Sequence, residues 1–83
     1  MTANELGSTL ARASIRELNS RQVRAMVRQI VRLGYEGWRL KYAEVEQKKP
    51  AVQGALRRIE AAGIDTELVL RAMYDELVRI SVS

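Results

Sequence analysis

The chain has 83 residues, a net charge of +4, and no histidine or cysteine. Its length fits one small domain, and the two missing residue types exclude Cys/His zinc sites, thiol chemistry and Ser-His or Cys-His nucleophilic catalysis. Hydrophobic residues make up 47% of the chain and charged residues 29%, which is typical of an ordered globular protein. The sequence shows neither an uncharged run long enough to span a bilayer nor an N-terminal secretory pattern. We therefore expect a cytoplasmic protein. No membrane contact, metal or cofactor is expected.

Positive charge is concentrated in the first half of the chain. Residues 1–43 carry eight cations against three anions, a net of +5, and residues 44–83 carry six cations against seven anions, a net of −1. Seven of the eight N-terminal cations are arginine, whose planar guanidinium binds phosphate and carboxylate groups at two points. This asymmetry predicts a surface that faces phosphates or an acidic protein, the alternative being a solvated arginine face without a partner.

The N-terminal segment predicts two helices separated by a short turn. A first helix over about residues 3–18 carries an apolar stripe of Leu6, Leu10 and Ala13. Ser20 is the expected N-cap of a second helix over about 21–33. One face of that helix is apolar, with Val23, Met26, Val27, Ile30 and Leu33. The opposite face carries Arg21, Arg24, Arg28 and Arg32 within an arc of roughly 80°.

Gly34 is expected to end this helix in the left-handed conformation. A shorter helix then runs to about Lys48, with Trp38, Tyr42 and Val45 on its apolar side. One continuous helix over 21–48 is the alternative, but it would turn Lys41 and Glu44 onto the apolar face. The pattern therefore favours a break at Gly34–Gly37.

Two further helices are expected in the second half. Pro50 suits the first position of a helix whose apolar residues are Val52, Ala55, Leu56, Ile59 and Ala62. Gly63 ends that helix and Asp65 caps the next, over about 66–80. The last helix is apolar over a wide arc, which indicates either a central core helix or packing against a second copy. Its predicted oligomer interface comprises Val69, Met73, Tyr74, Leu77 and Ile80.

These elements predict an all-α fold, a small bundle of four to five short helices in a single domain over 1–83. It combines a basic segment, 12–41, with a near-neutral helical hairpin, 50–80. The order of a helix, a short turn and an arginine-rich helix over residues 9–28 resembles a helix-turn-helix. Ala13, Leu18, Ser20, Val23 and Met26 fit its pattern, while Arg12, Arg16 and Glu17 do not.

Three classes of function remain open. The leading one is a regulator-like protein that contacts nucleic-acid phosphates through Arg21, Arg24, Arg28, Arg32, Arg39 and Lys41. The second is a protein-interaction module (an adaptor, an inhibitor or a self-assembling subunit) whose arginines meet an acidic partner. In both cases a homo-oligomer is expected, because so small a core gains from a partner subunit.

An enzyme is the third class. Residues 62–78 are similar to the final helix of the short chorismate mutases, an all-helical family that catalyses with Arg, Lys and Glu side chains. This resemblance covers about a fifth of the chain and consists mainly of a helix stop and a cap. The arginine and lysine spacing of that family's first helix is not reproduced around Arg24, Arg28 and Lys41. We therefore assign no catalytic residue and expect no enzyme.

Overall fold

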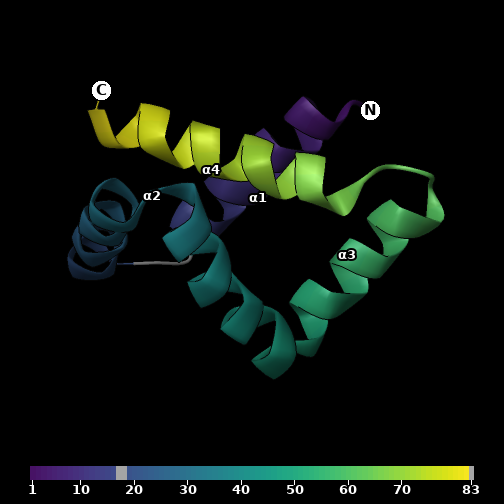
Figure 1. Cartoon of the computed structure of the whole chain (residues 1–83), viewed down its shortest axis with the longest axis horizontal. Coiled ribbons are helices and arrows are strands. Elements are labelled where there is room, and N and C mark those ends of the chain that lie inside the picture. Colours follow the sequence, from purple (N-terminus) through teal and green to yellow (C-terminus); the bar gives the residue numbers. More distant parts are fainter. Residues whose placement is uncertain (17–18, 83) are drawn as a thin grey trace.

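The computed structural model describes residues 1–16 and 19–82, and within these ranges it contains helices and no strand. Four helices follow one another along the chain: α1 (Ala3–Arg16), α2 (Ser20–Lys48), α3 (Pro50–Ala61) and α4 (Thr66–Val82). Helices α1 and α4 lie across one side of the molecule, while α3 and the second half of α2 diverge from them and meet in a V (Figure 1). The predicted all-α class is confirmed.

Helix α2 changes direction at Gly34. This residue has φ 69° and ψ −171°, which lie outside the helical region, whereas the residues on either side remain helical. A positive φ is accessible to glycine without the steric penalty that a Cβ atom brings. The predicted break is confirmed, and a straight helix over 21–48 is wrong.

The α2 N-terminus is capped one residue earlier than we expected. The Asn19 side chain accepts a hydrogen bond from the Gln22 amide at 2.9 Å, and the Gln22 side chain accepts one from the Asn19 amide at 3.1 Å. This reciprocal pair is a capping box that satisfies two amides at the helix start. The prediction that Ser20 is the N-cap is therefore wrong, because Ser20 is already the first residue of the helix.

The predicted boundaries of α3 and α4 are confirmed. Pro50 occupies the first turn of α3, where its missing amide hydrogen is not needed. Gly63 has φ 81°, and the amide of Ile64 donates to the Ile59 carbonyl at 3.3 Å, which closes the C-terminus of α3 as a Schellman motif. The carboxylate of Asp65 accepts from the Glu67 amide at 2.9 Å and so caps α4.

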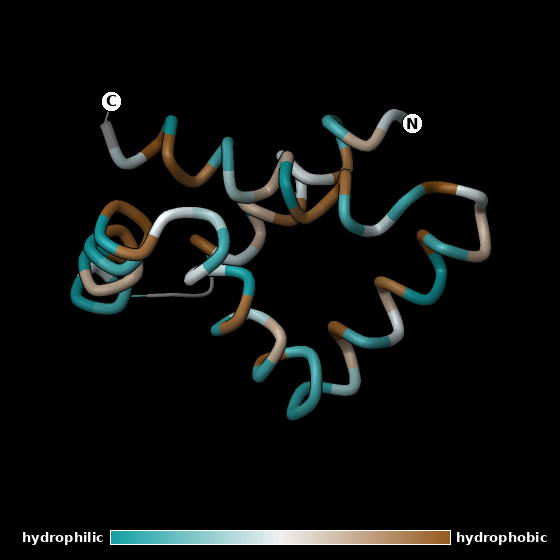
Figure 2. Tube along the Cα trace, in the orientation of Figure 1, coloured by the Kyte–Doolittle hydropathy of each residue, from teal (hydrophilic) through white to brown (hydrophobic). Residues whose placement is uncertain are grey.

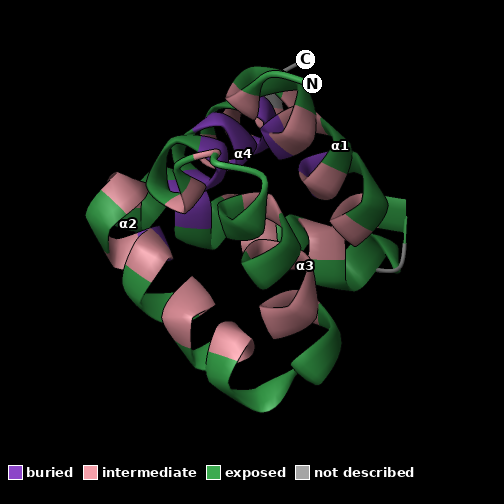
Figure 3. Cartoon of the chain, turned by 90° about the vertical axis from the view of Figure 1, so that its right-hand side faces the viewer, coloured by how far each residue is buried: buried purple, intermediate pink, exposed green. Residues whose placement is uncertain are grey.

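The hydrophobic core is built around α4 (Figure 3). Among the described residues, five of the eight buried hydrophobic side chains belong to this helix: Val69, Leu70, Ala72, Met73 and Leu77. Three of them had been assigned to an oligomer interface. Val69, Met73 and Leu77 are at most 2% exposed within one chain, so they offer no surface to a second copy. Tyr74 and Ile80, from the same set, are half-buried.

Helix α1 packs on α4 through small residues. Gly7 and Ala11 are buried, whereas Leu6 and Leu10 are only half-buried and Ala13 is exposed. Leu10 of the predicted apolar stripe packs partly against the core, but the buried residues of α1 lie on another face of the helix. These small side chains let the backbones of α1 and α4 approach closely. The contact between α1 and α4 is the most extensive between any two helices of the described chain.

Two expected helix pairings are not observed. A helix-turn-helix requires its two helices to pack together, but α1 contacts α4 extensively and α2 very little within the described residues. Glu17 and Leu18, which would form the turn, lie outside the described residues. Helices α3 and α4 diverge after Gly63, so residues 50–80 do not form a packed hairpin (Figure 1).

Candidate anion-binding surface

Four arginines lie along the solvent side of the first half of α2. Ile30 is 1% exposed and anchors this half of the helix to the core, with Met26 packed partly against the same cluster. The helical repeat places the arginines on the opposite side. All four are exposed, as the amphipathic pattern predicts: Arg21, Arg24, Arg28 and Arg32.

These cations have no acidic partner in the described part of the chain. Each salt bridge found there involves another basic residue, namely Arg12, Arg39, Arg71 or Arg79. Lys41 is likewise exposed and unpaired among the described residues. A set of five uncompensated charges on one helix produces a positive potential that attracts anions.

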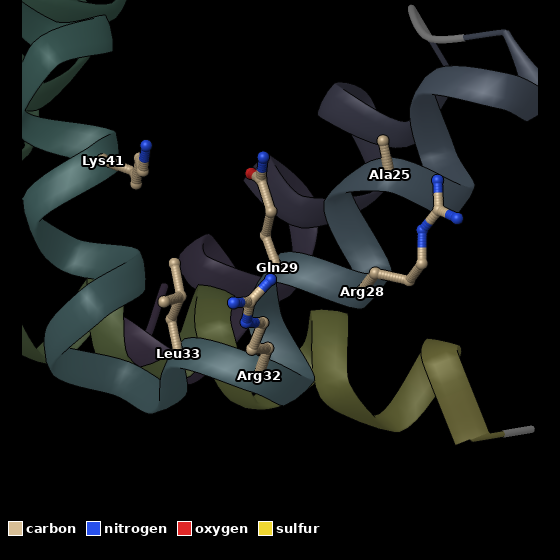
Figure 4. Close-up of a pocket in the computed structure, with 6 residues that line it drawn as sticks. All are labelled: Ala25, Arg28, Gln29, Arg32, Leu33 and Lys41. Carbon is tan, nitrogen blue, oxygen red and sulfur yellow. The ribbon is translucent and has the colours of Figure 1, made fainter.

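The break at Gly34 makes part of this surface concave. Arg28, Gln29 and Arg32 come from the first half of α2, and Lys41 faces them from the second half (Figure 4). Together with Ala25 and Leu33 they line a hollow of about 560 Å³. A second hollow of about 260 Å³ is lined by Arg21, Arg24 and Arg28. Because Arg28 borders both, the two hollows form one basic surface, which we call the α2 basic surface.

Arg39 lies apart from the α2 basic surface, so the prediction that it belongs to this surface is wrong. Its guanidinium donates to Glu46 at 2.9 Å and to Glu67 at 2.9 Å, and its side chain is 24% exposed. It thus joins the second half of α2 to α4 as a structural ion pair. Arg39 does not continue the row of exposed arginines because the non-helical backbone at Gly34 rotates the second half of α2 relative to the first.

The aromatic residues near Arg39 face the interior and not the α2 basic surface. Trp38 is 6% exposed and stacks on Tyr42 with ring centroids 5.1 Å apart. Tyr74 contacts Trp38 at 5.7 Å and Tyr35 at 5.4 Å, and the Arg71 guanidinium lies 4.6 Å from the centre of the Tyr35 ring. These rings fill the junction of α2 and α4, so they do not form a platform on which bases could stack.

Glu67 makes the α2–α4 junction sensitive to acid. The hydrogen bond from Arg39 lowers the pKa of Glu67, and the hydroxyl of Tyr35 also donates to it, at 3.2 Å. A carboxyl group with a lowered folded-state pKa stabilises the fold above its unfolded pKa, and this contribution is lost as the pH falls through the folded value.

We predict that Glu67→Gln lowers stability at neutral pH by about 0.2–1 kcal/mol, the usual range for an exposed ion pair. Urea unfolding of both proteins near pH 7 and near pH 3 measures the effect. The difference between them should shrink as the pH falls, because protonation of wild-type Glu67 removes the charge that the variant lacks. Glu76, whose pKa is lowered by Arg79, is present in both proteins and cancels. An equal difference at both pH values would contradict this role of Glu67.

Sequence reasoning identified the cations but not the hollow. Two lining residues were missed. Gln29 is uncharged, and Leu33 was assigned wholly to the apolar face of the helix. The predicted break at Gly34 was the available signal. A bent helix can bring residues on either side of the bend, such as Arg32 and Lys41, to one concave surface.

Comparison with known proteins finds no family model, curated protein or solved structure that matches the chain. The similarity of residues 62–78 to one helix of chorismate mutases is thus not extended to the rest of the chain. Within the described residues, no helix is both long enough and apolar enough to cross a bilayer. No cluster of His, Cys, Asp or Glu suited to a metal ion is present there either.

Proposed function

We propose that this protein binds nucleic acid by its phosphate backbone, through the α2 basic surface. The observation that carries the proposal is the set of five exposed cations without an acidic partner in the described chain: Arg21, Arg24, Arg28, Arg32 and Lys41. Arginine and lysine supply most phosphate contacts in such complexes. The proposal assigns a binding role and no catalytic step.

The dimensions of the surface support contact with several phosphates at once. At 1.5 Å per residue, Arg21 and Arg32 are separated by about 17 Å along the helix axis. Duplex DNA carries, on each strand, one phosphate per 3.4 Å of its helix axis, so a surface of this length can contact several phosphates. The hollow at Gly34 adds Lys41 from a second direction, which lets one phosphate be approached from both halves of α2.

Fluorescence anisotropy with labelled random-sequence oligonucleotides tests the proposal. Duplex DNA, single-stranded DNA and single-stranded RNA are titrated with the full chain at about 50 mM salt, where phosphate contacts are strong. We expect micromolar binding to at least one of the three probes. Absence of binding to all of them at this ionic strength would exclude the proposed function.

An acidic protein surface is the second candidate partner, and exposed aliphatic side chains favour it. Val31 is 67% exposed and lies next to Arg32 in the sequence, and Leu33 is 41% exposed and lines the hollow itself. Arginine mixed with apolar side chains is typical of protein interfaces. Failure of the nucleic-acid titrations, with the α2 basic surface still required to retain an acidic protein, would favour this candidate.

A further inference from the structure

An open apolar groove runs between α1 and α3, on a part of the molecule that the proposed function does not use. Its outer part has a volume of about 450 Å³ and is lined by Leu6 and Leu10 of α1 and by Ala55 and Ile59 of α3. Its inner part, about 190 Å³, shares Leu10 and Ala55 and reaches Tyr42. Apart from Thr9, Ser14, Arg58 and the hydroxyl of Tyr42, the lining side chains are apolar.

Helix α3 is incompletely covered by the rest of the chain. None of its residues is buried, although hydrophobic positions recur along it at helical intervals (Figures 2 and 3). Gly54, near its middle, has no other part of the chain within 4 Å of where a Cβ atom would stand. Helix α1 is in the same situation on one side, because its leucines are half-buried while its small residues face α4. The groove is therefore open to the side chains of a further helix.

We infer that the groove is occupied by α1 of a second copy of this chain, packed antiparallel to the first α1 about a twofold axis near Leu10. In such a dimer each α1 enters the groove between α1 and α3 of the other protomer, so the interface is isologous. At about 100° per residue, Leu6, Leu10 and Ala13 lie within an arc of about 60° and form the seam. The second copy thereby covers the partly exposed side of this stripe.

Charge complementarity specifies this occupant and its direction. Glu5 and Arg16 are both exposed, and neither has an ion-pair partner within the described residues. They lie about 20° apart around the helix, on the flank of the seam that faces away from Gly7 and Ala11. Residues on the same flank face each other across two antiparallel helices, whereas a parallel pair brings opposite flanks together.

The axial positions of these charges also match. Glu5 and Arg16 are 11 residues apart, about 17 Å along α1, and Leu10 is close to the midpoint. In the antiparallel pair, Glu5 of one protomer is therefore level with Arg16 of the other, and the twofold axis creates two such pairs. Arg12, on the same flank, is directed to Glu76 of its own chain at 3.9 Å, so Arg16 is the available cation.

Sedimentation velocity of the full chain, with charge-reversal variants, tests the inference. Wild-type protein should change from one chain to two between about 5 and 200 µM, the range expected for a small interface. Glu5→Arg places two arginines opposite each other in the dimer, and Arg16→Glu places two glutamates opposite each other. Each variant alone should raise the dimer dissociation constant by about tenfold or more.

Mixing the two variants tests the proposed pairing of Glu5 with Arg16 most directly. The Glu5→Arg chain presents two arginines and the Arg16→Glu chain presents two glutamates, so a heterodimer restores both attractive pairs. Each substitution also opposes the α1 dipole, but mixing does not relieve that local cost, and circular dichroism of each variant checks the fold. Dimer mass regained on mixing supports the antiparallel seam. A monomeric wild type at the highest concentration, or variants that dimerise as well as wild type, would overturn it.

Discussion

Gly7→Ala is expected to destabilise the protein by about 3 kcal/mol or more, the upper part of the range for overpacked cores. A Cβ atom at Gly7 would stand 2.6 Å from the Ala72 Cβ atom, 2.6 Å from the Val69 carbonyl oxygen and 2.7 Å from the Met73 amide nitrogen. Two of these three neighbours are backbone atoms of α4, which cannot move aside by changing a rotamer. Helices α1 and α4 would have to separate. At the usual per-residue scale the whole fold is stabilised by about 4–12 kcal/mol, so this loss is large.

Gly54→Ala provides the matched control. It makes the same chemical change inside a helix, but at a position where the added methyl group meets no atom within 4 Å. Alanine is favoured over glycine in a helix by about 1 kcal/mol, so this variant should be more stable than wild type. Urea unfolding followed by circular dichroism compares the three proteins. Equal stability of the two variants would contradict the close α1–α4 contact.

Arg24→Glu/Arg28→Glu is expected to weaken nucleic-acid binding by about 100-fold or more at low salt, because two phosphate contacts become repulsive. Both side chains are exposed and unpaired among the described residues, so the fold should be retained. Anisotropy titration measures the binding, and circular dichroism checks the helix content. Unfolding of this variant would instead identify the arginines as structural.

Lys49→Glu/Arg57→Glu is the matched control for that experiment. It changes the net charge by the same amount, at exposed residues at the start of α3 and within it, outside the α2 basic surface. A small loss of affinity is expected from the overall charge alone. Comparable losses in the two variants would show that binding depends on net charge and not on the α2 basic surface.

Local signals in the sequence predicted most of the helix ends. Pro50, Gly63 and Asp65 act within one turn of their own position, so their roles could be predicted without knowledge of the tertiary structure. Asn19 was missed in favour of Ser20 because both residues are good caps. The capping-box partner Gln22, three residues after Asn19, distinguishes them.

Tertiary packing could not be predicted in the same way. Hydrophobic periodicity places Leu6 and Leu10 on the inner face of α1, but the close crossing with α4 selects Gly7 and Ala11 instead. The hydrophobic periodicity of a helix does not show which other helix it will pack against. For the same reason the wide apolar arc of α4 left two alternatives open, a central core helix and an oligomer interface, and the structure shows that α4 is the central helix of one chain.

The candidate site was predicted in composition but not in shape. Amphipathic periodicity placed Arg21, Arg24, Arg28 and Arg32 on one exposed face, as the structure shows. Arg39 was predicted to belong to the same surface, and only the tertiary structure reveals the two carboxylates that hold it. The hollow depends on the angle at Gly34, which the presence of a glycine does not determine.

The salt dependence of binding tests the central claim most directly. With about four to five phosphate contacts, the logarithm of the binding constant should fall with the logarithm of salt concentration at a slope near −4. Affinity for the oligonucleotide that binds best should therefore drop at least ~100-fold between ~50 and ~200 mM salt. Arg24→Ala/Arg28→Ala should reduce the slope by about 2, one unit for each contact removed. A shallow slope in wild type, or an unchanged slope in the variant, would contradict phosphate binding by the α2 basic surface.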